Sequence, residues 1–135
     1  MDAALRDLVR TRAGHCCEYC RIPQAAAPFL SFHIEHIEAR QHVVDDSPDN
    51  LALACPGCNY RKGPNLVTLD ALTREIVQLF HPRRDVWRDH FEYRGAILVG
   101  RSPVGDATIR LLQINTLERL EMRVELQNDG EMQGA

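Results

Sequence analysis

Residues 55–63 decide how this chain folds, because they join a pair of cysteines to the start of a helix; they read Cys55-Pro56-Gly57-Cys58-Asn59-Tyr60-Arg61-Lys62-Gly63. A pair with the same spacing, Cys17-Glu18-Tyr19-Cys20, precedes it, and 34 residues separate the two pairs. Each Cys-x2-Cys turn can offer two thiolates at about 2.3 Å from a zinc ion, so two turns complete a tetrahedral site. We therefore predict a structural Zn²⁺ bound by Cys17, Cys20, Cys55 and Cys58.

A closed site of four thiolates leaves zinc no open position, so this ion would contribute folding energy and no chemistry. Two other interpretations remain open for the four cysteines. They could be buried apolar side chains, or a redox pair, although neither pair has the strand and helix context of a thioredoxin-like motif. Cys16 is a fifth cysteine, which either has no metal role or replaces Cys17 as a ligand.

Between the two cysteine pairs and just after the second, the sequence pattern predicts the order strand, loop, strand, helix. Residues 29–37 read as a strand, with Glu35 on one face and His36 on the other. Residues 38–50 are rich in Asp, Ser, Pro and Asn, which is typical of a surface loop. Residues 51–54 predict a second short strand. Residues 59–62 are expected to begin a helix, which Gly63-Pro64 would stop.

The rest of the chain also carries periodic and capping signals. An amphipathic pattern predicts a helix before Gly14. The signals further along predict strands over 75–80 and 96–99, helices over 85–91, 103–114 and 116–127, and a disordered tail over 128–135. We therefore expect a single α+β domain over 1–127, with a motif core at 16–64 and an extension over 65–127.

Composition limits the classes of function. The chain has 135 residues and a formal net charge of -3, which argues against a protein that coats nucleic acid through clustered Lys and Arg. The acidity lies near the end, since residues 1–101 hold 13 basic and 13 acidic side chains and residues 102–135 hold 3 and 6. No run of about 18 apolar residues and no signal-peptide pattern occurs, so we expect a cytoplasmic protein without membrane contact.

Three short motifs around the predicted zinc site resemble the HNH endonuclease family. They are Glu35-His36 on a strand, Asn50-Leu51 before the next strand, and Cys58-Asn59-x2-Lys62 at the start of a helix. The stretch over 79–91 and residues 104–108 are also similar to small stand-alone HNH proteins. The resemblance implies a ββα-metal (His-Me finger) core stapled by the four cysteines, with added strands and two C-terminal helices.

The resemblance also implies the roles of the site residues. It makes His36 the general base, Glu35 and Asn59 the ligands of a catalytic divalent cation, Mg²⁺ or Mn²⁺, and Asn50 the residue that steadies the loop. Lys62 lies where the family often has a basic side chain. The implied reaction is one-metal hydrolysis of DNA, which leaves 5′-phosphate and 3′-hydroxyl ends.

The partner that we expect is DNA, double-stranded, bound by a monomer or a homodimer. Arg61, Arg83 and Arg84 are candidates for contacts with its phosphates, and the alternative for each is a solvated surface. For Lys62, too, the alternative is a solvated helix face, and for Asn50 it is an ordinary turn cap. A non-catalytic zinc module that binds nucleic acid, or a zinc domain for protein interaction, remains as a rival for the whole chain.

Two features depart from the family pattern. The family's usual acidic ligand is aspartate, and Glu35 is one methylene longer. Val43-Val44 stands where many relatives have Gly-Gly, and valine does not readily adopt positive φ. Four side chains keep open roles at this point: Cys16, His33, His42 and His81. Of these, His33 lies two residues before Glu35 on the same strand face and could assist the metal.

Overall fold

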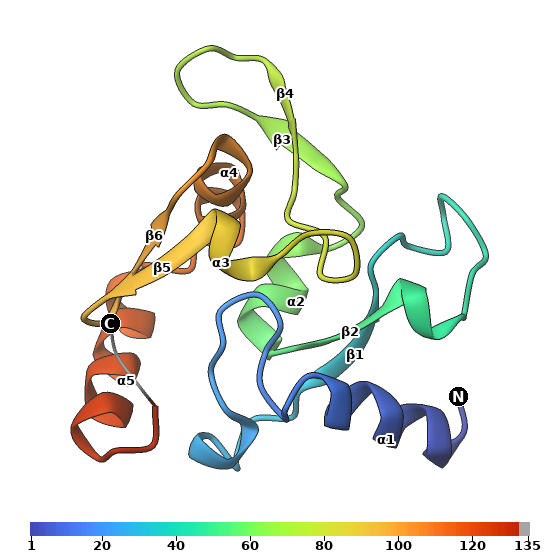
Figure 1. Ribbon diagram of the computed structural model, residues 1–135, viewed down its shortest axis with the longest axis horizontal. Helices are drawn as coiled ribbons and strands as arrows, with labels where there is room; N and C mark the ends of the chain where they lie inside the picture. The colour runs from blue at the N-terminus through green and yellow to red at the C-terminus, as the bar shows by residue number, and fades with distance from the viewer. Residues whose placement is uncertain (133–135) are drawn as a thin grey trace.

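The computed structural model describes residues 1–132 and has the mixed α+β composition that the sequence predicts (Figure 1). Its helices are α1 (Ala3–Arg12), α2 (Pro56–Lys62), α3 (Trp87–His90), α4 (Pro103–Leu111) and α5 (Leu117–Asn128), with two 3-10 turns, η1 (Gln24–Ala26) and η2 (Pro48–Asn50). Its strands are β1 (His33–His36), β2 (Leu51–Ala54), β3 (Val67–Leu69), β4 (Ile76–Gln78), β5 (Phe91–Arg94) and β6 (Ile97–Gly100). Consecutive strands form three separate antiparallel pairs.

The predicted order of strand, loop, strand and helix is confirmed in β1, β2 and α2. Glu35 pairs with Ala52 across the two strands, and all four residues of β2 are buried. The helix α2 starts directly after β2, since the Cys55 side chain accepts the Cys58 N–H and Pro56 occupies the first turn. It ends at Gly63, whose φ of 51° is unfavourable for residues with a Cβ atom.

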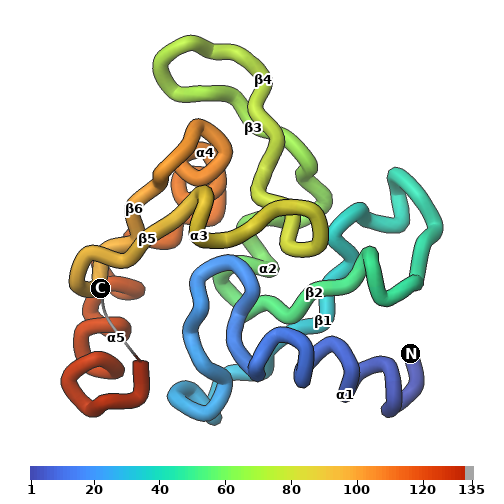
Figure 2. Tube along the Cα trace, in the orientation of Figure 1, coloured from blue at the N-terminus to red at the C-terminus, as the bar shows by residue number. Residues whose placement is uncertain are grey.

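Helix α1 packs against strand β2. The Asp2 carboxylate caps it by accepting the Leu5 N–H at 2.8 Å, and Val9 is its buried residue. At its C-terminal end, the Arg12 guanidinium donates to the Leu51 carbonyl of β2 at 2.8 Å. Figure 2 shows α1 passing alongside β1 and β2.

The C-terminal extension folds around α4 and α5. Gly105 of α4 lies so close to the His90 carbonyl that a Cβ atom would come within 2.0 Å of that oxygen, so the position requires glycine. From α5, the fully buried Arg123 donates to the carbonyls of Ala96 and Ile114, each at 2.8 Å. The β3–β4 hairpin projects from the rest of the molecule at the top of Figure 1.

Strand β1 is shorter than the predicted strand over 29–37. The preceding backbone bonds instead to one side chain, because the Gln24 amide donates to the Leu30 carbonyl at 2.6 Å and accepts the Phe32 N–H at 3.1 Å. Its partner β2 offers only four residues for pairing, so the ladder begins at His33. Phe29, which we expected in the strand, is 80% exposed.

Two further predictions need correction in the extension. The predicted helix over 85–91 contains only the short α3, because Phe91 pairs with Gly100 and so begins β5. The strand β3, which the sequence pattern does not predict, pairs with β4 inside the predicted strand over 75–80. Strand pairing overrides the local helical spacing at Phe91.

The predicted tail over 128–135 is only partly described. Asn128 is the last residue of α5, and Met132 is buried against the core. These positions are therefore part of the folded structure, whereas residues 133–135 lie outside the described part of the chain. Within that described part, no helix has the length and apolar character needed to cross a bilayer.

Candidate active site and metal centre

The four cysteines of the two Cys-x2-Cys pairs converge on one point. Their Sγ atoms all lie within 4.8 Å of one another, and all four residues are buried. Sulfur atoms at the corners of a tetrahedron with Zn–S bonds of about 2.3 Å lie roughly 3.8 Å apart. The distance between Cys20 Sγ and Cys55 Sγ is 3.7 Å, which fits a bound zinc ion.

The backbone turns of the two pairs are alike. The Cys20 N–H donates to Cys17 Sγ and the Cys58 N–H donates to Cys55 Sγ, both at 3.5 Å. These bonds stabilise negative charge on the sulfur atoms, so the turns are suited to thiolate ligands. Cys16 lies outside the cluster; it is partly exposed, and its thiol contacts the Gly14 carbonyl. The alternative in which Cys16 replaces Cys17 in the cluster is therefore wrong.

Side chains of the C-terminal extension contact this cysteine cluster. The Arg119 guanidinium of α5 lies 3.0 Å from Cys58 Sγ and 3.8 Å from Cys55 Sγ. The Tyr93 hydroxyl donates to the Cys20 carbonyl at 2.5 Å, and the Trp87 indole donates to the Tyr19 carbonyl at 2.8 Å. The extension therefore contributes a positive charge beside the thiolates and holds the first cysteine turn in place.

His36 lies at the end of β1 with its side chain 22% exposed. Its Nε2 atom is 2.7 Å from Asp46 Oδ1. One Arg40 amino group donates to both oxygens of the same carboxylate, at 2.8 and 2.9 Å. The contact with His36 and the charge of Arg40 lower the pKa of Asp46. Asp46 thus links the imidazole to the loop that follows β1.

Glu35 points to the opposite side of β1 and is buried. The Tyr19 hydroxyl donates to its Oε1 atom, and Lys62 Nζ lies 3.9 Å from its Oε2 atom. Burial raises the pKa of Glu35 to about 7, although the nearby Lys62 ammonium and the Tyr19 hydrogen bond act in the other direction. Oε2 accepts no hydrogen bond from the described residues, and the Glu35 side chain is 5% exposed.

Lys62 is 1% exposed, so its alternative assignment to a solvated helix face is wrong. Its ammonium donates to the Ile37 carbonyl at 2.8 Å, directly after β1, in addition to its approach to Glu35. Asn59 lies three residues earlier on the same face of α2 and is partly exposed. Lys62 therefore ties α2 to the end of β1.

Asn50 holds both ends of the loop over 38–50. Its side-chain oxygen accepts the Glu38 N–H at 2.8 Å, and its amide donates to the carbonyls of Glu38 and Asp45 at 3.0 and 2.8 Å. Farther along the loop, His42 Nε2 lies 3.0 Å from the Pro64 carbonyl beyond α2. Neither Val43 nor Val44 has positive φ, so this loop accommodates two valines without backbone strain.

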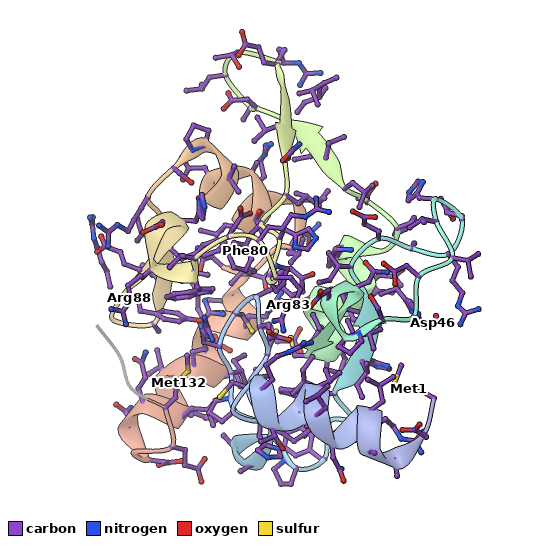
Figure 3. The ribbon with its side chains drawn as sticks, turned by 45° about the vertical axis from the view of Figure 1, so that its right-hand side comes forward. Met1, Asp46, Phe80, Arg83, Arg88 and Met132 are labelled. Atoms are coloured by element: carbon purple, nitrogen blue, oxygen red, sulfur yellow. The ribbon has the colours of Figure 1, made fainter. Side chains whose placement is uncertain are left out.

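Two of the candidate arginines make ion pairs within the protein. Arg83 pairs with the buried Glu18, which also accepts the Leu53 N–H of β2 at 2.8 Å. Arg84 lies 3.3 Å from a Glu38 oxygen. Figure 3 shows Arg83 near the centre of the molecule and Asp46 at its edge.

An open cavity of about 710 Å³ lies beside these two ion pairs. Its charged lining is balanced, with three arginines and three carboxylates: Arg12, Arg83, Arg84, Glu38, Asp45 and Asp49. His81 also lines it, and His81 Nδ1 accepts the N–H groups of Arg83 and Arg84 at 3.1 and 3.3 Å. Because the charges balance, this cavity does not by itself favour a phosphate.

The remaining candidates lie at the surface. Arg61 is exposed on α2, with its guanidinium 5.6 Å from the centre of the Tyr60 ring. His33 is exposed at the start of β1, and no hydrogen bond joins it to the groups around Glu35. Sequence reasoning did not identify Asp46, because it stands in a loop where several acidic residues look alike. It also missed Tyr19, which only the fold brings to Glu35.

Comparison with known proteins gives one match. Residues 17–65 match the family model described as HNH endonuclease. Neither a curated protein nor a solved structure matches the chain. The matched segment begins at Cys17, the first of the four clustered cysteines, and contains β1, β2 and α2 in full. Residues 17–65 of this chain are thus similar to the HNH endonuclease family.

Proposed function

We propose that this protein is a metal-dependent endonuclease that hydrolyses phosphodiester bonds in DNA, with His36 as the general base. The observation that carries the proposal is the partly exposed His36 imidazole, whose Nε2 atom is held by Asp46 at the end of β1. A neutral imidazole, with an unperturbed pKa of about 6.5, can accept a proton from water at neutral pH. The HNH match over residues 17–65 supports action on nucleic acid.

The oxygen donors of Glu35 and Asn59 suit a hard divalent cation. The Glu35 carboxylate keeps Oε2 without a hydrogen bond from the described residues, and Asn59 supplies a side-chain amide on the facing helix. Carboxylate and amide oxygens are ligands that Mg²⁺ and Mn²⁺ prefer. When bound there, such an ion would stabilise the negative charge that develops on the departing 3′-oxygen.

The chain's own groups would then carry out the following steps. His36 accepts a proton from a water molecule, and the water oxygen forms a bond to phosphorus. The bond from phosphorus to the 3′-oxygen breaks, and that oxygen takes up a proton from solvent. Arg61, which is exposed on α2, is a candidate for a phosphate contact. The buried Lys62 acts by holding α2 against β1.

One observation favours the rival function of a zinc module that binds nucleic acid without cutting it. Glu35 is 7% exposed and contacts Tyr19 and Lys62, as a purely structural carboxylate would. In that case, the protein would bind DNA, and Glu35 and His36 would only stabilise the fold. Cleavage and binding must therefore be measured on the same variants.

The test is plasmid cleavage by the zinc-loaded protein with added Mg²⁺ or Mn²⁺. We expect the wild type to cut, and His36→Ala to lose at least roughly a hundredfold in rate, since general base catalysis contributes about 10² to 10⁴. His33→Ala is the matched control, because His33 is an exposed histidine on the same strand, and it should cut at the wild-type rate.

Binding of labelled duplex and single-stranded oligonucleotides completes the experiment. His36→Ala should bind duplex as the wild type does, because its loss concerns the chemical step. Equal cleavage by His36→Ala and the wild type would remove His36 from the mechanism. If the wild type bound DNA and cut under none of the metal conditions, the non-catalytic module would be the correct function.

A further inference from the structure

We propose that Asp46 is a positioning residue for the reaction, which fixes the tautomer and orientation of His36 so that Nδ1 is the nitrogen that accepts the proton. This inference rests on the proposed nuclease function, and it goes beyond it by assigning a role to a residue outside the HNH motifs. Asp46 lies in the loop over 38–50, ten residues after His36.

The geometry of the pair is well defined. Asp46 Oδ1 lies 2.7 Å from His36 Nε2, a distance typical of a charge-assisted hydrogen bond. Arg40 donates to Oδ1 and Oδ2 at 2.8 and 2.9 Å, so the carboxylate has its two oxygens oriented by one guanidinium. Arg40, Asp46 and His36 therefore form a continuous chain from the exposed loop to the end of β1.

The loop itself is anchored next to this chain. Asn50 donates to the carbonyl of Asp45, the residue before Asp46, at 2.8 Å. The N–H of Ser47, the residue after Asp46, donates to the Asp45 carboxylate at 2.9 Å. The backbone on both sides of Asp46 is thus fixed, so the contact with His36 does not depend on the Asp46 side chain alone.

The chemistry of the contact determines the proton's position. An ionised carboxylate can only accept hydrogen bonds, so the neutral imidazole must carry its proton on Nε2 to make this contact. The lone pair then lies on Nδ1, which accepts no hydrogen bond from the described residues. A proton taken from water on Nδ1 gives an imidazolium whose charge the Asp46 carboxylate stabilises.

Asp46 would have an inhibitory role if Nε2 were the catalytic nitrogen, because its carboxylate would then occupy the place of the attacking water. The two roles predict changes of opposite sign when the carboxylate is removed, so kinetics can separate them.

The kinetic experiment uses the zinc-loaded full chain on a duplex substrate with Mg²⁺ or Mn²⁺. Asp46→Ala should lower kcat by roughly ten- to a hundredfold, the range typical for loss of a group that orients a histidine, and should leave KM within about twofold. Arg40→Ala should lower kcat by less, because the carboxylate remains. Asp49→Asn is the control, since it removes an exposed acid of the same loop that does not contact His36, and its kcat should equal that of the wild type.

A spectroscopic measurement tests the same proposal without activity. In ¹⁵N NMR spectra of the zinc-loaded protein at pH 8, without added Mg²⁺, the His36 signals should show the proton on Nε2 in the wild type and a mixture of tautomers in Asp46→Ala. An unchanged tautomer in Asp46→Ala, or a kcat that is equal or higher, would overturn the role of Asp46. If the wild type cut no DNA, the proposed function would fail, whereas the NMR result would still decide whether Asp46 positions His36.

Discussion

The Arg119 guanidinium in α5 lies 3.0 Å from Cys58 Sγ at the start of α2, although 61 residues separate them in the sequence. Burial acts to lower the pKa of Arg119, but the charges of the cysteines outweigh it and raise the pKa well above its usual range, so this group remains a cation. A site of four thiolates and one Zn²⁺ carries a net charge of about -2. With Zn²⁺ bound to the four cysteines, Arg119 would therefore offset part of the site's negative charge.

Arg119→Leu should weaken zinc binding by roughly tenfold or more, in line with the effect of outer groups on metal sites. The charge is lost and the hydrogen bond to Cys58 goes with it, while the four ligands stay. Competition with a chromogenic chelator measures the zinc affinity. Arg101→Leu is a suitable control because Arg101 is exposed and outside the zinc cluster. A zinc affinity of Arg119→Leu equal to that of the control would show that the guanidinium has no electrostatic role.

Loss of a zinc ligand should have a different effect from loss of the base. Structural zinc contributes about 10 to 16 kcal/mol in small zinc domains, which is comparable to the whole free energy of unfolding of a typical domain. Cys58→Ser should therefore abolish the cooperative thermal transition seen by circular dichroism. His36→Ala should shift Tm by no more than a few degrees, because its side chain is partly exposed. Similar destabilisation by both changes would contradict the separation of a structural centre from a reactive one.

The clustering of the four cysteines and the ββα order could be predicted from the sequence because these depend on local spacing. Two identical Cys-x2-Cys turns and the strand before His36 can be recognised without knowledge of the rest of the chain. The partners of the zinc centre could not be predicted in the same way. Tyr93 contacts the Cys20 carbonyl across 73 residues, and only the tertiary fold brings the two together.

Sequence reasoning predicted the faces of β1 on which two candidate site residues lie, but not the burial of Lys62. The alternation of β1 placed Glu35 and His36 on opposite faces, which the structure has. The burial of Lys62 could not be inferred, since a polar residue on a short helix reads the same whether it faces solvent or a buried carboxylate. Lys62 is buried because the Ile37 carbonyl and the Glu35 carboxylate lie next to its ammonium. Both residues are 25 or more positions away in the sequence, so local spacing does not predict these contacts.

Lys62→Met should lower the free energy of unfolding by about 3 kcal/mol or more, because Glu35 then stays buried without its cation and the Ile37 carbonyl loses its donor. The double variant Lys62→Met with Glu35→Gln should recover part of that loss, since no uncompensated charge remains. Urea unfolding in zinc-containing buffer gives the free energy of unfolding of the wild type, the single variant and the double variant. Arg61→Met, on the exposed face of the same helix, should change stability by less than about 0.5 kcal/mol. A Lys62→Met variant as stable as Arg61→Met would contradict the buried position of the ammonium.

His81 should make the stability of the fold depend on pH. Burial, followed by the charge of Arg84, lowers the pKa of His81. Its Nδ1 atom accepts two backbone N–H groups, which a protonated imidazole cannot do. Below a pH of about 6.5, His81 binds a proton in the unfolded chain but stays neutral in the folded protein until the pH is lower. The free energy of unfolding that His81 contributes is therefore present at neutral pH and is lost as the pH falls.

His81→Asn should reduce this dependence, because the Asn side-chain oxygen can accept the same N–H groups and does not titrate. The measurement is the free energy of unfolding between pH 5 and pH 8 for the wild type and the variant. Protonation of the cysteine ligands acts on both proteins alike, so the difference between the two curves isolates His81. His15→Asn provides the comparison with an exposed histidine and should follow the wild-type curve. If the His81→Asn and wild-type curves ran parallel over the whole range, the two N–H contacts of His81 would not govern its protonation.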